Sequence, residues 1–510
     1  MSLNAKRIIV GLLSFLFLIT LIIVAWVEGL QQRLADDPIP VLSGDNKNCY
    51  TCHQEKTPGV AAQWADGTHA MAGVGCLDCH KAEEGDLDAW HHEGRLIAAL
   101  VTPKDCGRCH TDISAEFQES HHAKAGEILG SLDNVLGETI EGPAAAHAGC
   151  QQCHGSKIAL QTDEQGKTKK DKNGKPLIDR TTWPNSGIGR INLDGSIGTC
   201  TACHSRHRFS IEMARRPDNC GKCHLGPDHP QKEIYDESKH GIAFVTADQQ
   251  GKMKMSEKKW VVGETYSAAP TCATCHMSAT KNQKRTHNPG NRISWTLRPA
   301  VSKRQENWEE KKRGMVDVCG NCHAPDWIAG HYTQYDDAVE LYNSKFAKPA
   351  KKIMGALKSA GLVTKTPFDD KIEWTFFYLW HHEGRRARMG ASMMAPDYTQ
   401  WHGFFEVAER FYQELIPEAL ELAHEHPEVT AVIAEVMDME EHRWKKGMSA
   451  KEMEKVQKFY KERYGQEKGG APAPAPEPAP EAAAAKAPDP AKAPEPTPAP
   501  TPAPAKAEAH

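Results

Sequence analysis

The chain has 510 residues, 39% of them hydrophobic, and its 62 Lys and Arg residues against 67 Asp and Glu residues give a formal net charge of -5. Length alone would suggest roughly three or four domains, but the hydrophobic fraction is low for several ordinary cores. The near balance of charges creates no strong overall field, which excludes a dedicated nucleic-acid binder, so we expect no nucleic-acid partner.

An apolar segment follows two basic residues near the N-terminus. Lys6 and Arg7 precede the uncharged run Ile8 to Val27, which would span about 30 Å as a helix, the thickness of a bilayer's hydrocarbon core. A cleaved signal usually has a shorter apolar region and an A-x-A-like site, and no such site follows Val27. We predict that residues 1–30 are an uncleaved membrane anchor, with a cleaved signal as the alternative. The protein would then be a single-pass protein of the cytoplasmic membrane, with its remaining part on the outer, periplasmic side.

All 16 Cys residues fall in C-x-x-C pairs, and every pair is followed directly by His. Four Cys₄ zinc sites would place no demand on that next residue, whereas C-x-x-C-H is the signature of covalent haem attachment. Two thiols bond the vinyl groups on one porphyrin edge, while the adjacent imidazole binds the iron. We predict eight covalently bound haem c groups, held by Cys49, Cys52 and His53; Cys76, Cys79 and His80; Cys106, Cys109 and His110; Cys150, Cys153 and His154; Cys200, Cys203 and His204; Cys220, Cys223 and His224; Cys272, Cys275 and His276; and Cys319, Cys322 and His323.

The eight motifs are densely spaced along the chain. They lie within the 275 residues from Cys49 to His323, so neighbouring porphyrins must pack close together and supply apolar core that the side chains do not. Close haems also form a continuous path for electrons. No Cys remains for a disulfide, which fits haem attachment followed by residence in an oxidising compartment outside the cytoplasm.

A haem closed to substrate needs a second axial ligand, and the chain has 18 His residues outside the motifs. We predict as distal iron ligands those in polar or turn contexts near the motifs, with a surface or structural role as the alternative for each. They are His69, His92, His122, His207, His240, His287 and His382. The pentapeptide Trp-His-His-Glu-Gly begins at both Trp90 and Trp380, which suggests similar duties at two haems, with coincidence as the alternative.

The C-terminal part has a different pattern. From about residue 336, apolar residues recur at three- and four-residue spacing over Val339–Leu362 and Phe404–Met437, which predicts long helices. We therefore predict a mainly α fold, with a multihaem cytochrome c core wrapped around eight covalent haems and a long-helix C-terminal region. The predicted domains are the anchor, an octahaem domain at 31–335, a helical region at 336–468 and a disordered Ala/Pro-rich tail at 469–510.

Two groups of basic residues stand out between and after the motifs. The segment Gly166 to Lys175 lies between the fourth and fifth motifs and is interpreted as a solvated hairpin turn. Arg385, Arg386 and Arg388 follow the second His-His-Glu-Gly string. We interpret these arginines as partners of haem propionates, with attraction of an anion toward a haem pocket as the alternative.

Four strings, together with the eight motifs, resemble the octahaem hydroxylamine oxidoreductase family over about residues 45–465. They are Gly198–His207, Cys220–His229, Ser238–Gly241 and Pro396–Gly403. The resemblance implies a mainly helical subunit assembled as a homotrimer, with seven bis-His haems and one five-coordinate catalytic haem at the fourth motif.

The resemblance also implies roles for individual residues. Asp228 and His229 match the family's distal Asp-His pair over the catalytic haem, and Tyr332 matches an active-site Tyr. Tyr398 is the candidate for the Tyr that cross-links to the haem of a neighbouring subunit in oxidising members, with a packed aromatic as the alternative. Nitrite reductases of the octahaem type with a proximal Lys are disfavoured, because all eight motifs end in His.

The resemblance implies an oxidoreductase of nitrogen metabolism that acts on a small nitrogenous substrate. The implied reaction is the oxidation of hydroxylamine to nitric oxide or nitrite. Reduction of nitrite or hydroxylamine to ammonia is one alternative, and a non-catalytic membrane-tethered electron conduit is another. The third alternative is a structural protein that holds disulfides or binds zinc. The anchor and tail are not features of the soluble type members, so the redox partner is either a partner protein or a quinone-linked partner.

Overall fold

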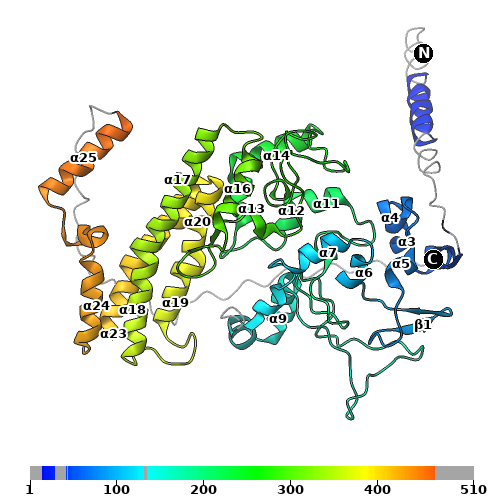
Figure 1. The fold of residues 1–510 in the computed structure, drawn as a ribbon, viewed down its shortest axis with the longest axis horizontal. Coiled ribbons are helices and arrows are strands. Elements are labelled where there is room, and N and C mark those ends of the chain that lie inside the picture. Colours follow the sequence, from blue (N-terminus) through cyan, green and yellow to red (C-terminus); the bar gives the residue numbers. More distant parts are fainter. Residues whose placement is uncertain (1–13, 29–41, 43, 131–134, 466–510) are drawn as a thin grey trace, which may run out of the picture. The chain divides into compact units, whose positions relative to one another are not determined.

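The computed structural model describes residues 14–28, 42, 44–130 and 135–465 (Figure 1). The chain divides into two compact units, Met1–Asp438 and Met439–His510. Of the predicted anchor at 1–30, residues 1–13 and 29–30 lie outside the described residues, while residues 14–28 are helical with exposed apolar side chains. Within the described ranges, no helix is both long and apolar enough to cross a membrane. The anchor therefore stays a prediction, and the predicted tail at 469–510 lies outside the described residues.

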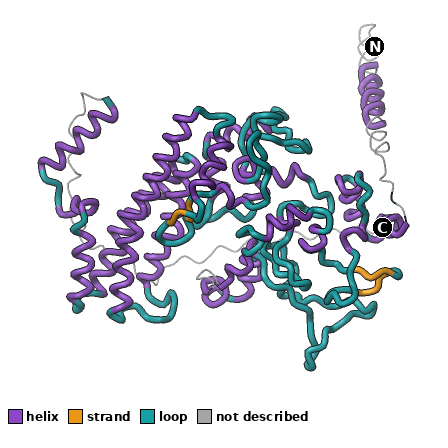
Figure 2. The backbone as a smooth tube through the Cα atoms, viewed as in Figure 1, coloured by secondary structure: helices purple, strands orange, loops and turns teal. Residues whose placement is uncertain are grey.

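The part of the first unit that carries the motifs is built from short helices joined by loops (Figure 2). Several motif helices begin with a capping box, in which Thr102 pairs with Asp105 and Thr271 with Thr274, so the orphan amide groups of the first turn are satisfied locally. The α-helices are α2 (Gly44–Lys56), α3 (Pro58–Ala65), α4 (Thr68–Met71), α5 (Cys76–His80), α6 (Pro103–Gly107), α7 (Thr111–Gln118), α9 (Pro143–Ala148), α10 (Cys150–His154), α11 (Ile211–Arg215), α12 (Pro217–Gly221), α13 (Gln231–Glu237), α14 (Lys239–Gln249), α15 (Cys272–His276) and α16 (Trp308–Cys319).

Short 3₁₀, π-helical and strand segments connect these helices. The 3₁₀ turns are η1 (Ala125–Gly130), η3 (Cys200–Ala202) and η4 (Pro289–Arg292), and the π-helical turn is η2 (Val135–Glu141). Two antiparallel pairs are formed by β1 (Trp90–His92) with β2 (Arg95–Ile97) and by β3 (Trp295–Thr296) with β4 (Lys303–Arg304). Trp90 lies opposite Ile97, and Trp295 lies opposite Arg304.

The rest of the first unit consists of long rods in which α-helical and π-helical segments follow one another without a break (Figure 1). The elements are α17 (Pro325–Leu341), η5 (Tyr342–Ala347), α18 (Lys348–Ser359), α19 (Lys371–Phe377), η6 (Tyr378–Glu383), α20 (Gly384–Met393), α21 (Pro396–Thr399), η7 (Gln400–Phe405), α22 (Glu406–Glu409), η8 (Arg410–Leu415), α23 (Ile416–Leu422) and α24 (Pro427–Met437). Their apolar faces form the largest core, around Tyr342, Leu357, Leu379 and Phe411.

The mainly helical multihaem cytochrome fold is confirmed, and the structure refines the ends of the predicted helices. The first predicted helix ends at Ser359, before Gly361, whose φ of 73° belongs to the left-handed region that favours glycine. The run Phe404–Met437 is two helices, because α23 ends at Leu422 and Pro427 opens α24. Proline has no amide hydrogen to continue a helix, yet it suits a first helical turn.

The second unit contains the 3₁₀ segment η9 (Glu440–Lys446) and helix α25 (Ala450–Tyr464). Ser449 caps α25 in a box with Glu452, and the helix has no buried residue. The predicted domain boundary between residues 335 and 336 falls within α17, and the domain limits stay predictions.

Candidate functional site

The eight C-x-x-C-H motifs form short turns or helix ends that hold two thiols and a histidine together. Three of them are whole short helices, α5, α10 and α15, and three begin at the C-terminus of α6, α12 and α16, while the first lies within α2 and the fifth begins in η3. All 16 cysteines belong to the described part of the chain, and no disulfide joins any of them there. The cysteines are thus available for covalent attachment, which requires unpaired thiols.

Paired imidazole rings face one another beside five of the motifs. An iron ion held by two imidazole nitrogens at about 2 Å each would separate the ring centres by about 6 Å. The ring centres are 6.2 Å apart for His53 and His92, 6.5 Å for His80 and His207, 6.2 Å for His110 and His69, 6.0 Å for His224 and His122, and 6.0 Å for His323 and His240. The residues present therefore fit haem iron between them.

Two motif histidines have a partner at Nδ1 that leaves the other ring nitrogen, Nε2, for iron. Nδ1 of His80 lies 2.9 Å from the carbonyl oxygen of Ala98, and Nδ1 of His53 lies 2.8 Å from Oγ1 of Thr57. A hydrogen bond at Nδ1 fixes the tautomer that leaves Nε2 for a metal. Such partners are typical of histidines that bind a metal.

Two further predicted distal ligands have less direct partners. His287 lies within electrostatic range of His204, which places it near the fifth motif. The ring of His382 packs instead against Phe377 and Tyr378, with ring centres 5.5 Å and 5.2 Å away. No ring contact joins His382 to a motif histidine in the described ranges, so its iron-binding role stays a prediction.

The thiols show which motifs are neighbours. Interactions between thiols link the first motif to the second, the second to the third, the third to the fifth, the fifth to the sixth, the sixth to the seventh and the seventh to the eighth. The pairs are Cys49 with Cys76, Cys79 with Cys106, Cys106 with Cys200, Cys203 with Cys220, Cys220 with Cys272, and Cys275 with Cys319. The fourth motif joins as a branch, because the thiol of Cys153 interacts with that of Cys223 in the sixth motif.

Asp228 and His229 lie at this branch, in the loop between α12 and α13. Nδ1 of His229 donates a hydrogen bond to Oδ1 of Asp228, and His229 is within electrostatic range of Cys153. The ring centre of His229 is 6.0 Å from that of His224. The pair directly follows the sixth motif in the chain, and the structure also brings it beside the fourth motif.

Two residues of the C-terminal rods complete the surroundings of Asp228. Nη1 of Arg385 donates to Oδ2 of Asp228 at 3.2 Å, and Nε2 of His381 lies 4.0 Å from the same oxygen. The side chain of Arg385 is only 8% exposed and that of Asp228 is 24% exposed. Nε and Nη2 of Arg385 both donate to the carbonyl oxygen of Arg298, at 3.2 and 2.9 Å, so the guanidinium group is held from two sides.

This arrangement sets the protonation of the pair. Burial alone would raise the pKa of Asp228, but the hydrogen bond from His229 and the charges of His381 and Arg385 lower that pKa to about 2. Burial also opposes a charged His229, yet the Asp228 carboxylate raises the pKa of His229 above its ordinary value. An ionised Asp228 therefore makes the His229 ring a stronger base.

The three arginines after the second His-His-Glu-Gly string contact protein groups. Besides Arg385, Arg386 donates to Oε2 of Glu406 at 2.6 Å, and the fully buried Arg388 donates to Oγ of Ser302 and the carbonyl oxygen of Gly384. Their sequence spacing gave no sign that Arg385 would reach Asp228, which lies 157 residues earlier. The propionate interpretation of these arginines stays a prediction.

The two predicted tyrosines lie elsewhere in the fold. Tyr332 on α17 is buried in an apolar cluster with Trp295 and Tyr335, and Nζ of Lys312 lies 4.2 Å from its ring centre. Burial, with Cys319 nearby, raises the pKa of Tyr332. In the described ranges no hydrogen bond or ring contact joins Tyr332 to Asp228 or His229, so the structure does not bring these predicted catalytic residues together.

Tyr398 on α21 packs at the edge of another apolar cluster. Its neighbours there are Ile234, Met389 and Ala395, and its ring centre is 5.5 Å from that of His402. Burial raises the pKa of Tyr398. A single chain holds no neighbouring subunit, so the cross-link predicted for Tyr398 stays a prediction.

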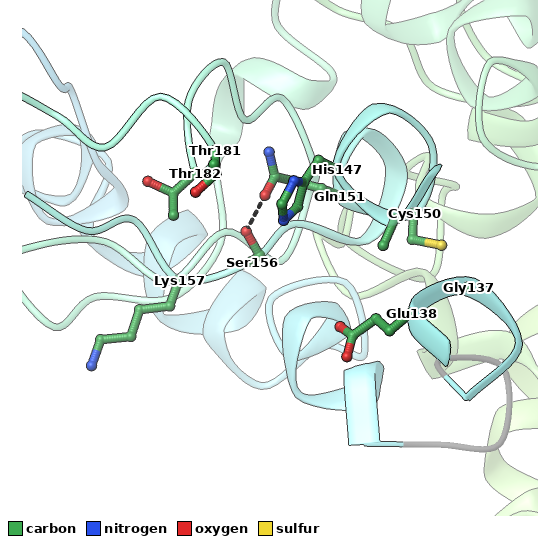
Figure 3. A pocket seen from close by; sticks show the side chains of 10 residues that line it. Gly137, Glu138, His147, Cys150, Gln151, Ser156, Lys157, Thr181 and Thr182 are labelled. Carbon is green, nitrogen blue, oxygen red and sulfur yellow. Dashed lines mark hydrogen bonds between the residues drawn. The ribbon is translucent and has the colours of Figure 1, made fainter. Parts of the chain in front are cut away.

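A cavity of about 210 Å³ borders the fourth motif (Figure 3). Cys150, Gln151, Glu138 and His147 line it, and the Ser156 hydroxyl donates to Oε1 of Gln151 at 2.6 Å. The cavity places polar side chains directly beside one of the thiols of this motif.

The repeated pentapeptide adopts two different structures. Its first copy forms strand β1 and the turn after it, and His92 there faces His53. Its second copy lies in η6 and α20, where His381 is buried and stacks on Phe377 with ring centres 4.2 Å apart. Shared sequence therefore does not give shared geometry here, because the surrounding elements decide the backbone conformation.

Family models for multihaem cytochromes match three parts of the chain. The model "Seven times multi-haem cytochrome CxxCH" matches residues 194–368. The models "Cytochrome c7 and related cytochrome c" and "Cytochrome c554 and c-prime" match residues 138–225 and 32–81. These matches cover motifs of the haem-attachment type, and the chain carries multiple covalent c-type haems.

Among characterised sequences, the chain is similar to a probable nitrite reductase-hydroxylamine oxidoreductase fusion protein of Kuenenia stuttgartiensis. The two are 25% identical over 338 residues, which cover 54% of this chain and 34% of that relative. The chain thus spans about a third of the length of the relative that it matches.

Two solved structures share the fold. A hypothetical multiheme protein superposes with a TM-score of 0.66 at 24% identity, covering 78% of this chain and 99% of that chain. The Kuenenia stuttgartiensis reducing HAO-like protein complex superposes with a TM-score of 0.54 at 19% identity, covering 76% of this chain and 87% of that chain.

Proposed function

We propose that the chain is a multihaem cytochrome c of the hydroxylamine oxidoreductase-like (HAO-like) family and that it oxidises hydroxylamine to nitric oxide or nitrite. The reaction centre is the fourth motif, with Cys150, Cys153 and His154, and the other seven motifs hold electron-relay haems. The proposal therefore includes eight covalently bound haem c groups, one at each motif.

One observation carries the proposal: the Asp228-His229 pair lies beside Cys153, the second thiol of the fourth motif. When bound there, the haem supplies an iron with one open position for a small nitrogen compound, and electron transfer to its neighbours.

The residues around that position act on protons. The Asp228 carboxylate raises the pKa of His229, which makes the ring a stronger base, and Asp228 orients the ring through Nδ1. Loss of hydrogen from a nitrogen substrate requires a group within hydrogen-bond reach that takes and releases protons. His229 has that role, and Arg385 holds Asp228 in place.

The position of the fourth motif also supports the proposal. It contacts the sixth motif, which lies within the series that runs from the first motif to the eighth. A reaction centre that branches from the middle of a relay can exchange electrons with either end.

The reverse direction is the second candidate. Reduction of nitrite or hydroxylamine to ammonia would use the same residues, and one of the proteins with this fold is named a reducing HAO-like protein complex. We favour oxidation because the string Pro396–Gly403, which contains Tyr398, resembles that of oxidising members. A homotrimer, an N-terminal membrane anchor and a redox partner outside the cytoplasm belong to the same proposal.

The test is His229→Ala in the full chain carrying its haems. We expect unchanged haem content and a turnover of hydroxylamine that is lower by about 10²- to 10⁴-fold, the usual range for loss of a general acid-base group. His424→Ala is the matched control, because His424 has a 72% exposed side chain. Unchanged turnover in His229→Ala would remove His229 from the site. A new high-spin haem in that variant would instead make His229 the axial ligand of the sixth motif.

A further inference from the structure

The segment 160–178 between the fourth and fifth motifs forms an extended loop with two tight turns, which we name the lysine hairpin. Isolated bridges pair Leu160 with Ile178, Thr162 with Thr168 and Lys170 with Pro176. The turns are closed by Oδ1 of Asp163, which accepts from the amides of Gln165 and Lys167, and by Oδ1 of Asp171, which accepts from the amides of Asn173 and Lys175. The loop is therefore shaped by its own hydrogen bonds.

The turns present a group of exposed lysines. They are Lys167, Lys169, Lys170 and Lys172. Within the described ranges, no carboxylate forms an ion pair with any of these four ammonium groups. Unpaired lysines clustered on one projecting loop create a local positive potential, although the whole chain has a net charge of -5.

A chain of contacts links the hairpin to the first motif. Nζ of Lys175 lies 5.0 Å from the ring centre of Trp90 on β1. The ring centre of Trp90 is 6.4 Å from that of His92, which is 6.2 Å from that of His53. The hairpin is thus anchored beside the histidine pair that fits the iron of the first motif.

The first motif is also suited to exchange electrons with another molecule. It stands at one end of the thiol series, next to the second motif. Its Cys52 and the distal candidate His92 are exposed. Electron transfer to a partner requires close approach, and an exposed end of the relay permits it.

We propose that the lysine hairpin is the docking surface for a redox protein with an acidic surface, which exchanges single electrons at the first motif. One electron passes between the reduced group at that motif and the oxidised centre of the partner, or in the opposite sense in a reductive enzyme. No bond forms or breaks and no proton moves. Acidic side chains on the partner pair with the lysines, so attraction steers its approach and weakens with salt.

The test uses the full chain with its haems and poly-L-glutamate as the acidic probe. The variant K167E/K169E/K170E/K172E reverses the hairpin charge. The matched control is K252E/K254E/K258E/K259E, which changes four exposed lysines of the loop before α15 and alters the net charge equally. The four Lys→Gln changes in the hairpin provide a second, milder variant if charge reversal lowers the yield of folded protein.

Two measurements are made at low salt: retention on immobilised poly-L-glutamate, and reoxidation of dithionite-reduced protein by ferricyanide with soluble poly-L-glutamate present. Wild type and the control should be retained, and the probe should slow their reoxidation about tenfold, within the usual range of electrostatic rate effects. The hairpin variants should pass unretained, with reoxidation unaffected by the probe. Dithionite loads the electrons without substrate, so failure of the proposed catalytic function leaves this test valid.

Three results would overturn the proposal. Equal loss of retention in the hairpin variant and the control would show an effect of overall charge. Retention that does not slow reoxidation would show that the hairpin lies away from the site of electron exchange. Binding to phosphatidylglycerol vesicles but not to poly-L-glutamate would make the lysines a membrane-surface contact.

Discussion

Substitution of Arg385 by Met tests whether the Asp228-His229 pair depends on the guanidinium group that holds it. The change removes the 3.2 Å hydrogen bond to Asp228 and both hydrogen bonds to the carbonyl oxygen of Arg298. A hydrogen bond to a charged group contributes about 1.5–3 kcal/mol, and breaking a fully buried pair costs about 3–5 kcal/mol. Since the Asp228 side chain is 24% exposed, we expect a loss of about 2–3 kcal/mol in the free energy of unfolding.

The effect on turnover should exceed the effect of lost stability. Without Arg385, one oxygen of Asp228 loses its partner, and the carboxylate can rotate away from Nδ1 of His229. A misplacement of about 1 Å at a reacting group can cost on the order of 10² in rate, so we expect kcat to fall about 10- to 100-fold while KM changes little. Arg385→Lys keeps the charge without the planar fork and should recover part of the rate.

Arg386→Met is the matched control for this experiment. Arg386 is the next residue, and its ion pair with Glu406 at 2.6 Å is also partly buried. Chemical denaturation and steady-state assay of both variants, at equal haem content, separate the two effects. We expect the two variants to lose similar amounts of stability, and we expect kcat to fall only in Arg385→Met. Equal kcat values in the two variants would refute a positioning role for Arg385.

Two further predictions concern the direction of catalysis and the N-terminus. If Tyr398 cross-links to the haem of a neighbouring subunit, denatured subunits should migrate as covalent oligomers and the reduced spectrum should have an additional red-shifted band, both lost in Tyr398→Phe; single subunits without that band would assign the protein to the reductive direction. For the predicted anchor, mass measurement of the mature protein should include residues 8–27 and extraction should need detergent, whereas a soluble form that starts after Val27 would refute it.

Local chemistry explains what could be predicted from sequence. The C-x-x-C-H motif predicts attachment because thiols and imidazole must stand at fixed spacing, and apolar periodicity predicted helices such as α18 and α24. Nearby polar histidines were sufficient to select His92 and His207, which now face motif histidines.

Long-range contacts explain what could not be predicted. Arg385 reaches Asp228 across 157 residues, and His381 approaches the same carboxylate from η6. Neither contact has a local signature, because each depends on the packing of the C-terminal rods. The branch from the fourth to the sixth motif is likewise a product of tertiary structure. The two copies of Trp-His-His-Glu-Gly show the limit of local sequence most plainly, since one is a strand and the other a helix.

Electron paramagnetic resonance of the oxidised, full-length protein tests the central claim most directly. The account predicts one high-spin ferric haem among low-spin haems, with the high-spin signal absent from Cys150→Ser/Cys153→Ser and retained in the matched variant Cys319→Ser/Cys322→Ser. A fully low-spin wild-type spectrum would contradict the account and favour an electron conduit. A high-spin signal that survives the loss of Cys150 and Cys153 would place the open iron at another motif.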